Sequence, residues 1–271
     1  MAQALLPLIV EAAELEKHLG ADNLLIVDLS RPETYAQAHL PGAVHLDYAQ
    51  IVAARPPAMG VLPDAAQLSA VLGSIGATPD SHIVAYDDEG GGRAARLLWT
   101  LDVIGHPRYS LLNGGLHAWL NERHPVNAEP ARRPRSSYPV TFSDGAVADK
   151  NYILGRLRDP GVVIVDARTP AEYRGENRRA ERAGHIPGAV NFDCMNEIDR
   201  TRNLRLRPAE ELKQVLSHLG VTPDKEVIAY CQTHHRSAHT YIMLKSLGYP
   251  RVRGYPGSWS EWGNSPDAPI E

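Results

Sequence analysis

Cysteine is scarce in this sequence: Cys194 and Cys231 are the only thiols among 271 residues. Two cysteines cannot form a disulfide framework in a chain of this size, so a reducing compartment is favoured and each thiol needs its own explanation. Long apolar runs are lacking too, because no stretch approaches the roughly 18 residues of a membrane-spanning helix. The opening MAQALLPLIVEAAELEKHLG has a short apolar run with no basic segment before it, unlike a secretion signal. We therefore expect a cytoplasmic protein with no membrane partner.

Charge of one sign is not in excess either. The formal net charge is −4, and acidic and basic residues are mixed along the chain, so no general field favours nucleic acid as a partner. Apolar residues, in contrast, make up 43% of the sequence, which is enough for a sizeable core. The length suits two domains better than one.

The two halves of the chain repeat one pattern. LLIVDLSRPETYAQAHLPGAVHLDY (24–48) matches VVIVDARTPAEYRGENRRAERAGHIPGAVNFDC (162–194). IVAYDDEGGGRAARLLWTLDVIGHPRYSLLNGGLHAWL (83–120) matches VIAYCQTHHRSAHTYIMLKSLGYPRVRGYPGSWSEWG (227–263). A repeat of this extent indicates two copies of one domain.

The segment between the copies differs from both in composition. PVNAEPARRPRSSYPVTFSDGAVADK (125–150) contains four prolines and no apolar periodicity, which is typical of an extended linker. We predict a first domain over residues 1–125, a linker over 126–145 and a second domain over 146–271.

Short β-branched apolar runs alternate with helical patterns in each copy. In the first copy LLIVDL, AVHL, HIVAYD and YSLLN predict strands, while PDAAQLSAVLGSIG, GRAARLLWTLDVIG and LHAWLNE predict helices. Nearly continuous apolar strands separated by helices are typical of a mostly parallel sheet covered on both faces. We expect an α/β protein with two similar domains of this kind, whose ligands lie beyond the carboxyl ends of strands.

The stretch VIAYCQTHHRSAHTY (227–241) places a thiol at such a strand end. EVIAY predicts a strand, Cys231 follows it directly, and SAHTYIMLKSLGY has the spacing of a buried helix. Amides of a tight loop and of a first helical turn can converge on one anion. Nearby cations lower a cysteine pKa from about 8.5 to roughly 3.5–7.5. Cys231 is therefore a candidate nucleophile, with Arg236 as a permanent cation and His234 and His235 as further ones.

Two other interpretations of this loop stay open from the residues alone. In the first, Cys231 is a small buried hydrophobe, which is the common fate of a lone cysteine. In the second, it binds zinc with His234, His235 and His239. The spacing C-x2-H-H-x3-H lacks the paired C-x2-C and H-x3-5-H arrangement of structural zinc sites. We expect no metal and no other cofactor.

The matching loop of the first copy reads DDEGGGR. Asp87 takes the place of the cysteine, and Asp88 and Glu89 add negative charge. Such a loop cannot attack as a thiolate and repels anions, and its glycines do not match the nucleotide-binding pattern G-x-G-x-x-G. We expect the first copy to be non-catalytic.

Three further segments carry a family resemblance: YAQAHLPGAVHL (35–46), GHIPGAVNF (184–192) and VRGYPGSWSEW (252–262). They resemble the signatures of the two-domain rhodaneses, or thiosulfate sulfurtransferases, and CQTHHR is similar to the loop of a bacterial variant. The resemblance implies that Cys231 takes a sulfane sulfur from a donor such as thiosulfate, becomes a persulfide, and passes the sulfur to cyanide or another thiophilic acceptor. A dithiol or a protein is an alternative acceptor.

Resemblance and residue chemistry together define a candidate site. Cys231 is the nucleophile, and Arg236 counters the charge as sulfite leaves. The remaining loop residues are expected to bind the substrate: Gln232, Thr233, His234, His235 and Ser237. No cofactor is implied.

The sequence also departs from the thiosulfate-specific branch of the family. That branch has the loop Cys-Arg-Lys-Gly-Val-Thr, whose two cations correspond here to Gln232 and Thr233, and its pocket arginine corresponds to Glu172. The donor is therefore open between thiosulfate and a related compound such as 3-mercaptopyruvate. The second copy carries an added RGENRRAER (174–182), which is either a solvated surface loop or a means of steering anions.

Two rival functions come from other classes. Phosphatases and arsenate reductases of this domain type have C-x5-R, one residue longer than the spacing from Cys231 to Arg236, so we expect negligible phosphatase activity. A persulfide carrier or sensor would hold sulfur with little turnover. Two mutually covering domains favour a monomer.

Several signature residues have structural roles by expectation. LPG (40–42) and IPG (186–188) set turns rather than touch the substrate. Tyr255 and Trp259 either pack in the core, as large aromatics at helical spacing usually do, or line the pocket. Cys194 is expected to be a small buried residue rather than a resolving thiol.

Overall fold

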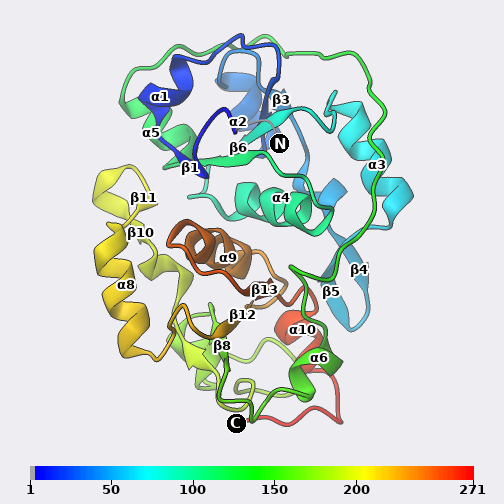
Figure 1. The fold of residues 1–271 in the computed structure, drawn as a ribbon, viewed down its shortest axis with the longest axis vertical. Helices are drawn as coiled ribbons and strands as arrows, with labels where there is room; N and C mark the ends of the chain where they lie inside the picture. Colours follow the sequence, from blue (N-terminus) through cyan, green and yellow to red (C-terminus); the bar gives the residue numbers. More distant parts are fainter. Residues whose placement is uncertain (1–3) are drawn as a thin grey trace. The chain divides into compact units, whose positions relative to one another are not determined.

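The computed structural model describes residues 4–271, which divide into two compact units (Figure 1). The first unit comprises the chain up to Val52, Pro63–Ser143 and Asp199–Arg205. The second comprises Ala53–Leu62, Asp144–Ile198 and Leu206–Glu271. No helix in the described part of the chain has the length and apolar character needed to cross a membrane.

A five-stranded parallel sheet forms the centre of the first unit, in the order β1-β7-β6-β2-β3. Its strands are β1 (Ile9–Val10), β2 (Leu24–Asp28), β3 (Val44–His45), β6 (His82–Tyr86) and β7 (Tyr109–Leu112). Every residue of β2 and β6 is buried, as expected of strands covered on both faces. Strand β1 was not foreseen, because two residues are too few to leave a pattern.

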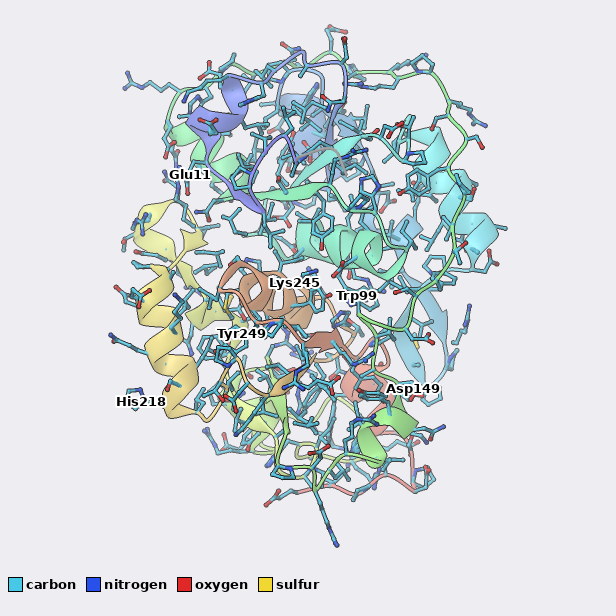
Figure 2. The ribbon with its side chains drawn as sticks, viewed as in Figure 1. Glu11, Trp99, Asp149, His218, Lys245 and Tyr249 are labelled. Atoms are coloured by element: carbon cyan, nitrogen blue, oxygen red, sulfur yellow. The ribbon has the colours of Figure 1, made fainter. Side chains whose placement is uncertain are left out.

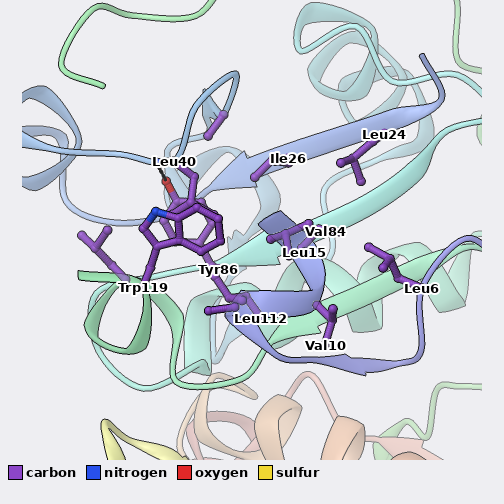
Figure 3. Packing of buried hydrophobic residues seen from close by; sticks show 13 residues of the cluster. Leu6, Val10, Leu15, Leu24, Ile26, Leu40, Val84, Tyr86, Leu112 and Trp119 are labelled. Atoms are coloured by element: carbon purple, nitrogen blue, oxygen red, sulfur yellow. Dashed lines mark hydrogen bonds between the residues drawn. The ribbon is translucent and has the colours of Figure 1, made fainter. Parts of the chain in front are cut away.

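Helices cover this sheet. They are α1 (Ala12–Glu16), α2 (Pro32–Gln37), α3 (Ala65–Ser74), α4 (Gly92–Val103) and α5 (Gly115–Asn121), with a 3-10 turn η1 (Tyr48–Ile51). Leu15 of α1 and Trp119 of α5 share a buried cluster with Ile26 and Val84 of the central strands (Figure 3). Helix α4 packs against β6 and β7, and Figure 1 shows it across the strands from α1 and α2. The predicted α/β class is confirmed.

The second unit has a four-stranded parallel sheet in the order β13-β12-β8-β9. Its strands are β8 (Val162–Asp166), β9 (Val190–Asn191), β12 (Glu226–Tyr230) and β13 (Val252–Gly254). Its helices are α6 (Lys150–Leu154), α7 (Pro170–Tyr173), η2 (Cys194–Asn196), α8 (Ala209–His218), α9 (Arg236–Ser246) and α10 (Ser258–Trp262). Strands β10 (Ile198–Asp199) and β11 (Arg205–Leu206) form a separate two-stranded sheet, and the 3-10 turn η3 (Arg200–Arg202) between them belongs to the first unit. The pairing of β8 with β12 has the register of β2 with β6, as a repeat requires.

One hairpin belongs to the first copy by sequence and to the second unit by structure. Strands β4 (Ala53–Arg55) and β5 (Ala58–Val61) pair antiparallel, and β5 packs against α10. Residues 128–143 form no helix or strand and belong to the first unit. The domain boundaries 1–125, 126–145 and 146–271 stay a prediction.

Each copy holds its proline-glycine turn with a buried tyrosine. The hydroxyl of Tyr230 donates to Asp166 Oδ2 at 2.6 Å and accepts from the amide of Ile186 at 3.2 Å. Gly188 then turns the chain at φ +74°, a conformation that favours glycine. Tyr86 has the corresponding partners in the first copy. The segments LPG (40–42) and IPG (186–188) therefore set turns, as predicted.

Candidate active site

Cys231 directly follows β12 and is 1% exposed. Residues 232–235 lead from it into α9, whose stretch from Ser237 to Leu244 is buried. Tyr249 (labelled in Figure 2) follows the far end of this helix, and its hydroxyl donates to the carbonyl of Val221 at 2.9 Å. The predicted placement of the thiol, between a buried strand and a buried helix, is confirmed.

The sulfur of Cys231 lies among several donors. Burial raises the pKa of this thiol, but the charge of Arg236, the hydroxyl and amide of Ser237, and the amide of Thr233 together lower it below the ordinary value. Because the thiolate is the nucleophilic form of cysteine, the loop stabilises the reactive state of the side chain.

The two loop histidines have different positions. His234 has a φ of +56° and a fully buried side chain, with Nδ1 2.8 Å from the Ser237 hydroxyl. With its proton on Nδ1, His234 donates to this hydroxyl, which donates in turn to the sulfur of Cys231. His235 is half-buried directly before α9. His234 thus supports the loop from inside, and contact of either ring with a substrate stays a prediction.

Arg236 is clamped by an acidic side chain from outside the loop. Its Nη1 and Nη2 donate to the two carboxylate oxygens of Glu172 at 2.7 and 2.9 Å. Glu172 is 4% exposed and forms a capping box with Thr169 at the start of α7. Burial raises the pKa of Glu172, but Arg236 and Thr169 bring it to about 2. Sequence reasoning did not foresee this pair, and its only local signal is the capping pattern T-P-A-E.

Helix α10 holds the backbone of the cysteine loop. The amide of Trp259 donates to the carbonyl of Cys231 at 2.9 Å, and the amide of Ser260 donates to the carbonyl of Gln232 at 3.0 Å. The amide of Cys231 donates to the hydroxyl of Ser258 at 3.3 Å, and Ser258 itself has a φ of +49°. The segment VRGYPGSWSEW therefore fixes the position of the nucleophile through main-chain contacts.

The aromatic residues of that segment belong to the core. Tyr255 and Trp259 are 0% and 1% exposed and pack in one buried cluster. The guanidinium of Arg168 lies over Trp259, 4.3 Å from the ring centroid, and pairs with Asp166 at 2.6 Å. Of the two expectations for these aromatics, the structure favours packing in the core.

The hairpin β4–β5 also touches the cysteine loop. The amide of Met59 donates to the hydroxyl of Ser260 at 3.1 Å. A Cβ at Gly60 would lie 2.0 Å from the carbonyl oxygen of Thr233, so only glycine allows this approach. This contact could not be predicted from the sequence, because no pattern links residues so far apart in the chain.

The insertion RGENRRAER is mostly engaged in structural contacts. Arg182 donates to the carbonyls of Ala268 and Trp262 at 2.8 and 3.1 Å, and Arg178 donates to carbonyls of its own loop. The insertion reaches the site through its backbone, because Gln232 Nε2 donates to the carbonyl of Arg179 at 3.1 Å. The contacts favour a surface loop that braces Gln232.

The second thiol lies beside the first. Cys194 is 8% exposed and forms a small buried cluster with Ala167 and Cys231. Burial and the charge of Glu197 raise its pKa far above that of an ordinary thiol. Its low exposure agrees with the prediction of a small buried residue. His239 Nδ1 is hydrogen-bonded to Glu197 Oε2 at 2.5 Å. Among residues 4–271, no three metal-binding side chains converge.

The loop of the first copy closes around its own carboxylate. Asp87 is fully buried, and its Oδ1 accepts hydrogen bonds from the amides of Glu89 and Gly91 at 3.0 and 2.8 Å. Its Oδ2 accepts from the amide of Ala94 at 3.0 Å. The position that matches the sulfur of the second copy is therefore filled by a fixed anion.

The chain thus contains two copies of one α/β domain, with a thiol at a parallel-strand end in one copy and a carboxylate at the matching strand end in the other. The rhodanese-like domain model matches residues 11–122 and 149–265, and the chain belongs to this family. It is 48% identical over 268 residues to the thiosulfate sulfurtransferase of Azotobacter vinelandii, covering 99% of this chain and 98% of that protein. The corresponding protein of Pseudomonas aeruginosa is 47% identical over 266 residues, covering 98% and 97%.

Solved structures support the fold. The wild-type structure of EanB superimposes with a TM-score of 0.87 at 21% identity, covering 97% of this chain and 69% of that one. At this identity the similarity establishes the α/β architecture alone. The prediction of a tandem rhodanese is confirmed by the family match and the relatives together.

Proposed function

We propose that this enzyme moves a sulfane sulfur from thiosulfate to cyanide or another thiophilic acceptor through a persulfide on Cys231. The thiolate attacks the outer sulfur of thiosulfate, a sulfur–sulfur bond forms, and sulfite leaves with the electron pair of the broken bond. Cyanide then attacks the outer sulfur of the persulfide, thiocyanate leaves, and the thiolate is restored. Splitting one transfer into two displacements is the advantage of a covalent intermediate.

The observation that carries this proposal is a buried thiol at a strand end, with Arg236, Ser237 and the amide of Thr233 placed to stabilise a negative sulfur. The amides of Thr233 and Ser237 and the charge of Arg236 favour a negative sulfur, in the thiolate and in the persulfide alike. Oriented donors in a water-poor site stabilise such charge without reorganising. Identity of 47–48% to proteins named thiosulfate sulfurtransferase supports the choice of donor.

The remaining roles follow from the same site. Arg236 offsets charge as sulfite forms, and Gln232, Thr233, His234, His235 and Ser237 shape the loop that the donor enters. The second copy is the catalytic one, and the first, with a carboxylate in place of the thiol, is non-catalytic. The proposed enzyme is a cytoplasmic monomer, and its acceptor in the cell is cyanide, a dithiol or a protein.

The test is thiocyanate formation from cyanide with thiosulfate and, separately, with 3-mercaptopyruvate. We expect continuous turnover with thiosulfate and none in Cys231→Ala, together with a gain of one sulfur atom in the mass of the wild-type chain after exposure to thiosulfate alone. One sulfur loaded per chain without turnover would instead identify a carrier. Hydrolysis of an aryl phosphate that depends on Cys231 would contradict sulfur transfer altogether.

A further inference from the structure

The first unit contains a groove remote in sequence from the cysteine loop. Its cavity volume is about 590 Å³, within the range of about 300–1,000 Å³ that holds small organic ligands. Helix and linker residues line it together, among them Tyr35, His45, Gln50, Arg132, Arg133 and Arg135. The catalytic proposal uses none of these residues.

The charge of this groove is one-sided. Three arginines line it, and no aspartate or glutamate does so among the described residues. Arg133 donates to the carbonyl of Leu24 at 2.8 Å, whereas no side-chain hydrogen bond or ion pair occurs at Arg132 or Arg135 within residues 4–271. The whole chain has a net charge of −4, so the absence of acidic residues from the described lining of this cavity, beside three arginines, is not a consequence of overall composition.

The linker that carries these arginines is fixed in place. The amide of Ala131 donates to the hydroxyl of Tyr35 at 3.2 Å, and the amide of Ser136 donates to the carbonyl of Gly73 at 3.0 Å. A Cβ at Gly76 would lie 2.8 Å from Cβ of Arg133, so the linker runs close over the end of α3. The three arginines therefore belong to a linker segment whose backbone is held in place by these contacts.

We propose that this groove binds a small organic polyanion, a phosphorylated compound of about nucleotide size, through the guanidinium groups of Arg132 and Arg135. Guanidinium forks match phosphate oxygens in pairs. The cavity is far larger than a single tetrahedral anion needs, which favours a ligand with an organic part.

Calorimetric titration of the full chain with ATP as the probe tests this site. We expect one ATP per chain, an affinity that weakens as salt rises, and a loss of about tenfold or more in affinity in Arg132→Gln/Arg135→Gln. The matched control is Arg200→Gln/Arg202→Gln, which removes the same charge from exposed η3 and should keep the wild-type affinity. No ATP binding by the wild type, or an equal loss in both double variants, would overturn the proposal.

A second and independent observation concerns Glu172. Both of its carboxylate oxygens accept hydrogen bonds from Arg236. Arg236 is the cation whose charge lowers the pKa of Cys231. One carboxylate and one guanidinium at this distance largely cancel each other's field for a third group. Thiosulfate carries two negative charges, so it is the donor that loses most from this cancellation.

Resting on the proposed function, we infer that Glu172 sets selectivity among sulfur donors by offsetting Arg236 and so weakens the binding of dianionic thiosulfate. It acts through Arg236 and is a positioning residue. Glutamine, like glutamate, occurs at the third position of capping boxes, so Glu172→Gln removes the charge and keeps an oxygen that can accept from Thr169.

Steady-state kinetics with thiosulfate separate charge from structure. Glu172→Gln should lower KM severalfold with kcat nearly unchanged, and the gain should shrink as salt rises. Glu176→Gln removes an equal charge from an exposed pair with Arg174 and should leave KM unchanged. A raised KM or a fall in kcat in Glu172→Gln would refute the inference, whereas absence of thiosulfate turnover in the wild type would refute the proposed function instead.

Discussion

The loops after β6 and β12 place two different groups in equivalent surroundings. In both copies a buried strand ends in a loop whose amides converge on one negative group. In the first copy that group is the carboxylate of Asp87, and in the second it is the sulfur of Cys231. A carboxylate held by its own loop does not act as a nucleophile, whereas a thiolate does. The fold supplies the anion site, and one side chain decides its use.

The charges around the two loops differ as well. In the first copy, Asp88 pairs with Arg31 at 3.0 Å and Glu89 pairs with Arg93 at 3.0 Å, so acids of the loop itself match the nearby cations. In the second copy the acidic partner of Arg236 is Glu172, which lies outside the loop. The second loop therefore contains no carboxylate that would oppose a thiolate directly.

Cys231→Asp gives the second loop the side chain of the first and has the largest expected effect. Thiocyanate formation should fall below detection, because no thiolate remains. The free energy of unfolding should change by less than about 2 kcal/mol, because the amides gain a carboxylate acceptor. Denaturant unfolding and the cyanide assay measure the two quantities. Residual turnover would show that another group carries the sulfur.

Gly60→Ala tests the support that the hairpin gives to the second loop. The new Cβ would overlap the carbonyl of Thr233, so hairpin and loop must separate. A displacement of about 1 Å near a nucleophile can cost about 100-fold in rate, and we expect kcat/KM to fall by about that factor. Gly155→Ala is the control, since its Cβ would have no neighbour closer than 3.6 Å. Equal activity of the two variants would show that the hairpin does not support the cysteine loop.

Arg236→Gln alters the charge at the thiolate without removing the thiol. Arg236 lowers the pKa of Cys231, so its loss should raise that pKa. Reactivity is present above the pKa and lost as pH falls through it. The rate of alkylation by iodoacetamide should therefore need a pH higher by about one unit or more. The control is Arg174→Gln, at an exposed arginine of the same unit, which should leave the pH profile of alkylation unchanged. An unchanged pH profile in Arg236→Gln would show that the charge of Arg236 has no influence on the thiol.

Cys194→Ser has the smallest expected effect. Serine is close to cysteine in size, and the raised pKa of Cys194 keeps it out of thiolate chemistry. We expect thiosulfate turnover within about twofold of the wild type and a loss of stability of about 1 kcal/mol from burying a hydroxyl. Turnover assays and denaturant unfolding measure these. Complete loss of turnover in a folded variant would give Cys194 a direct part in sulfur transfer.

Local and repeated features were predictable from the sequence. The repeat exposed the two copies, continuous apolar runs predicted β2, β6, β8 and β12, and the position of Cys231 followed from the strand before it. Two features were not predictable, because they join residues that no local pattern relates. Glu172 reaches Arg236 across 64 positions, and Met59 reaches Ser260 across 201. Such contacts depend on how the elements pack, which periodicity does not report.

The hairpin of Ala53–Leu62 shows that the two repeats are not separable modules. It is encoded within the first copy, yet it belongs to the structural unit of the second. A fragment cut out at the linker would contain Cys231, α9 and α10 but would lack Gly60 and the cover it places on Thr233. The carboxylate in place of a thiol therefore does not make the first copy dispensable, because part of that copy belongs to the unit that holds Cys231.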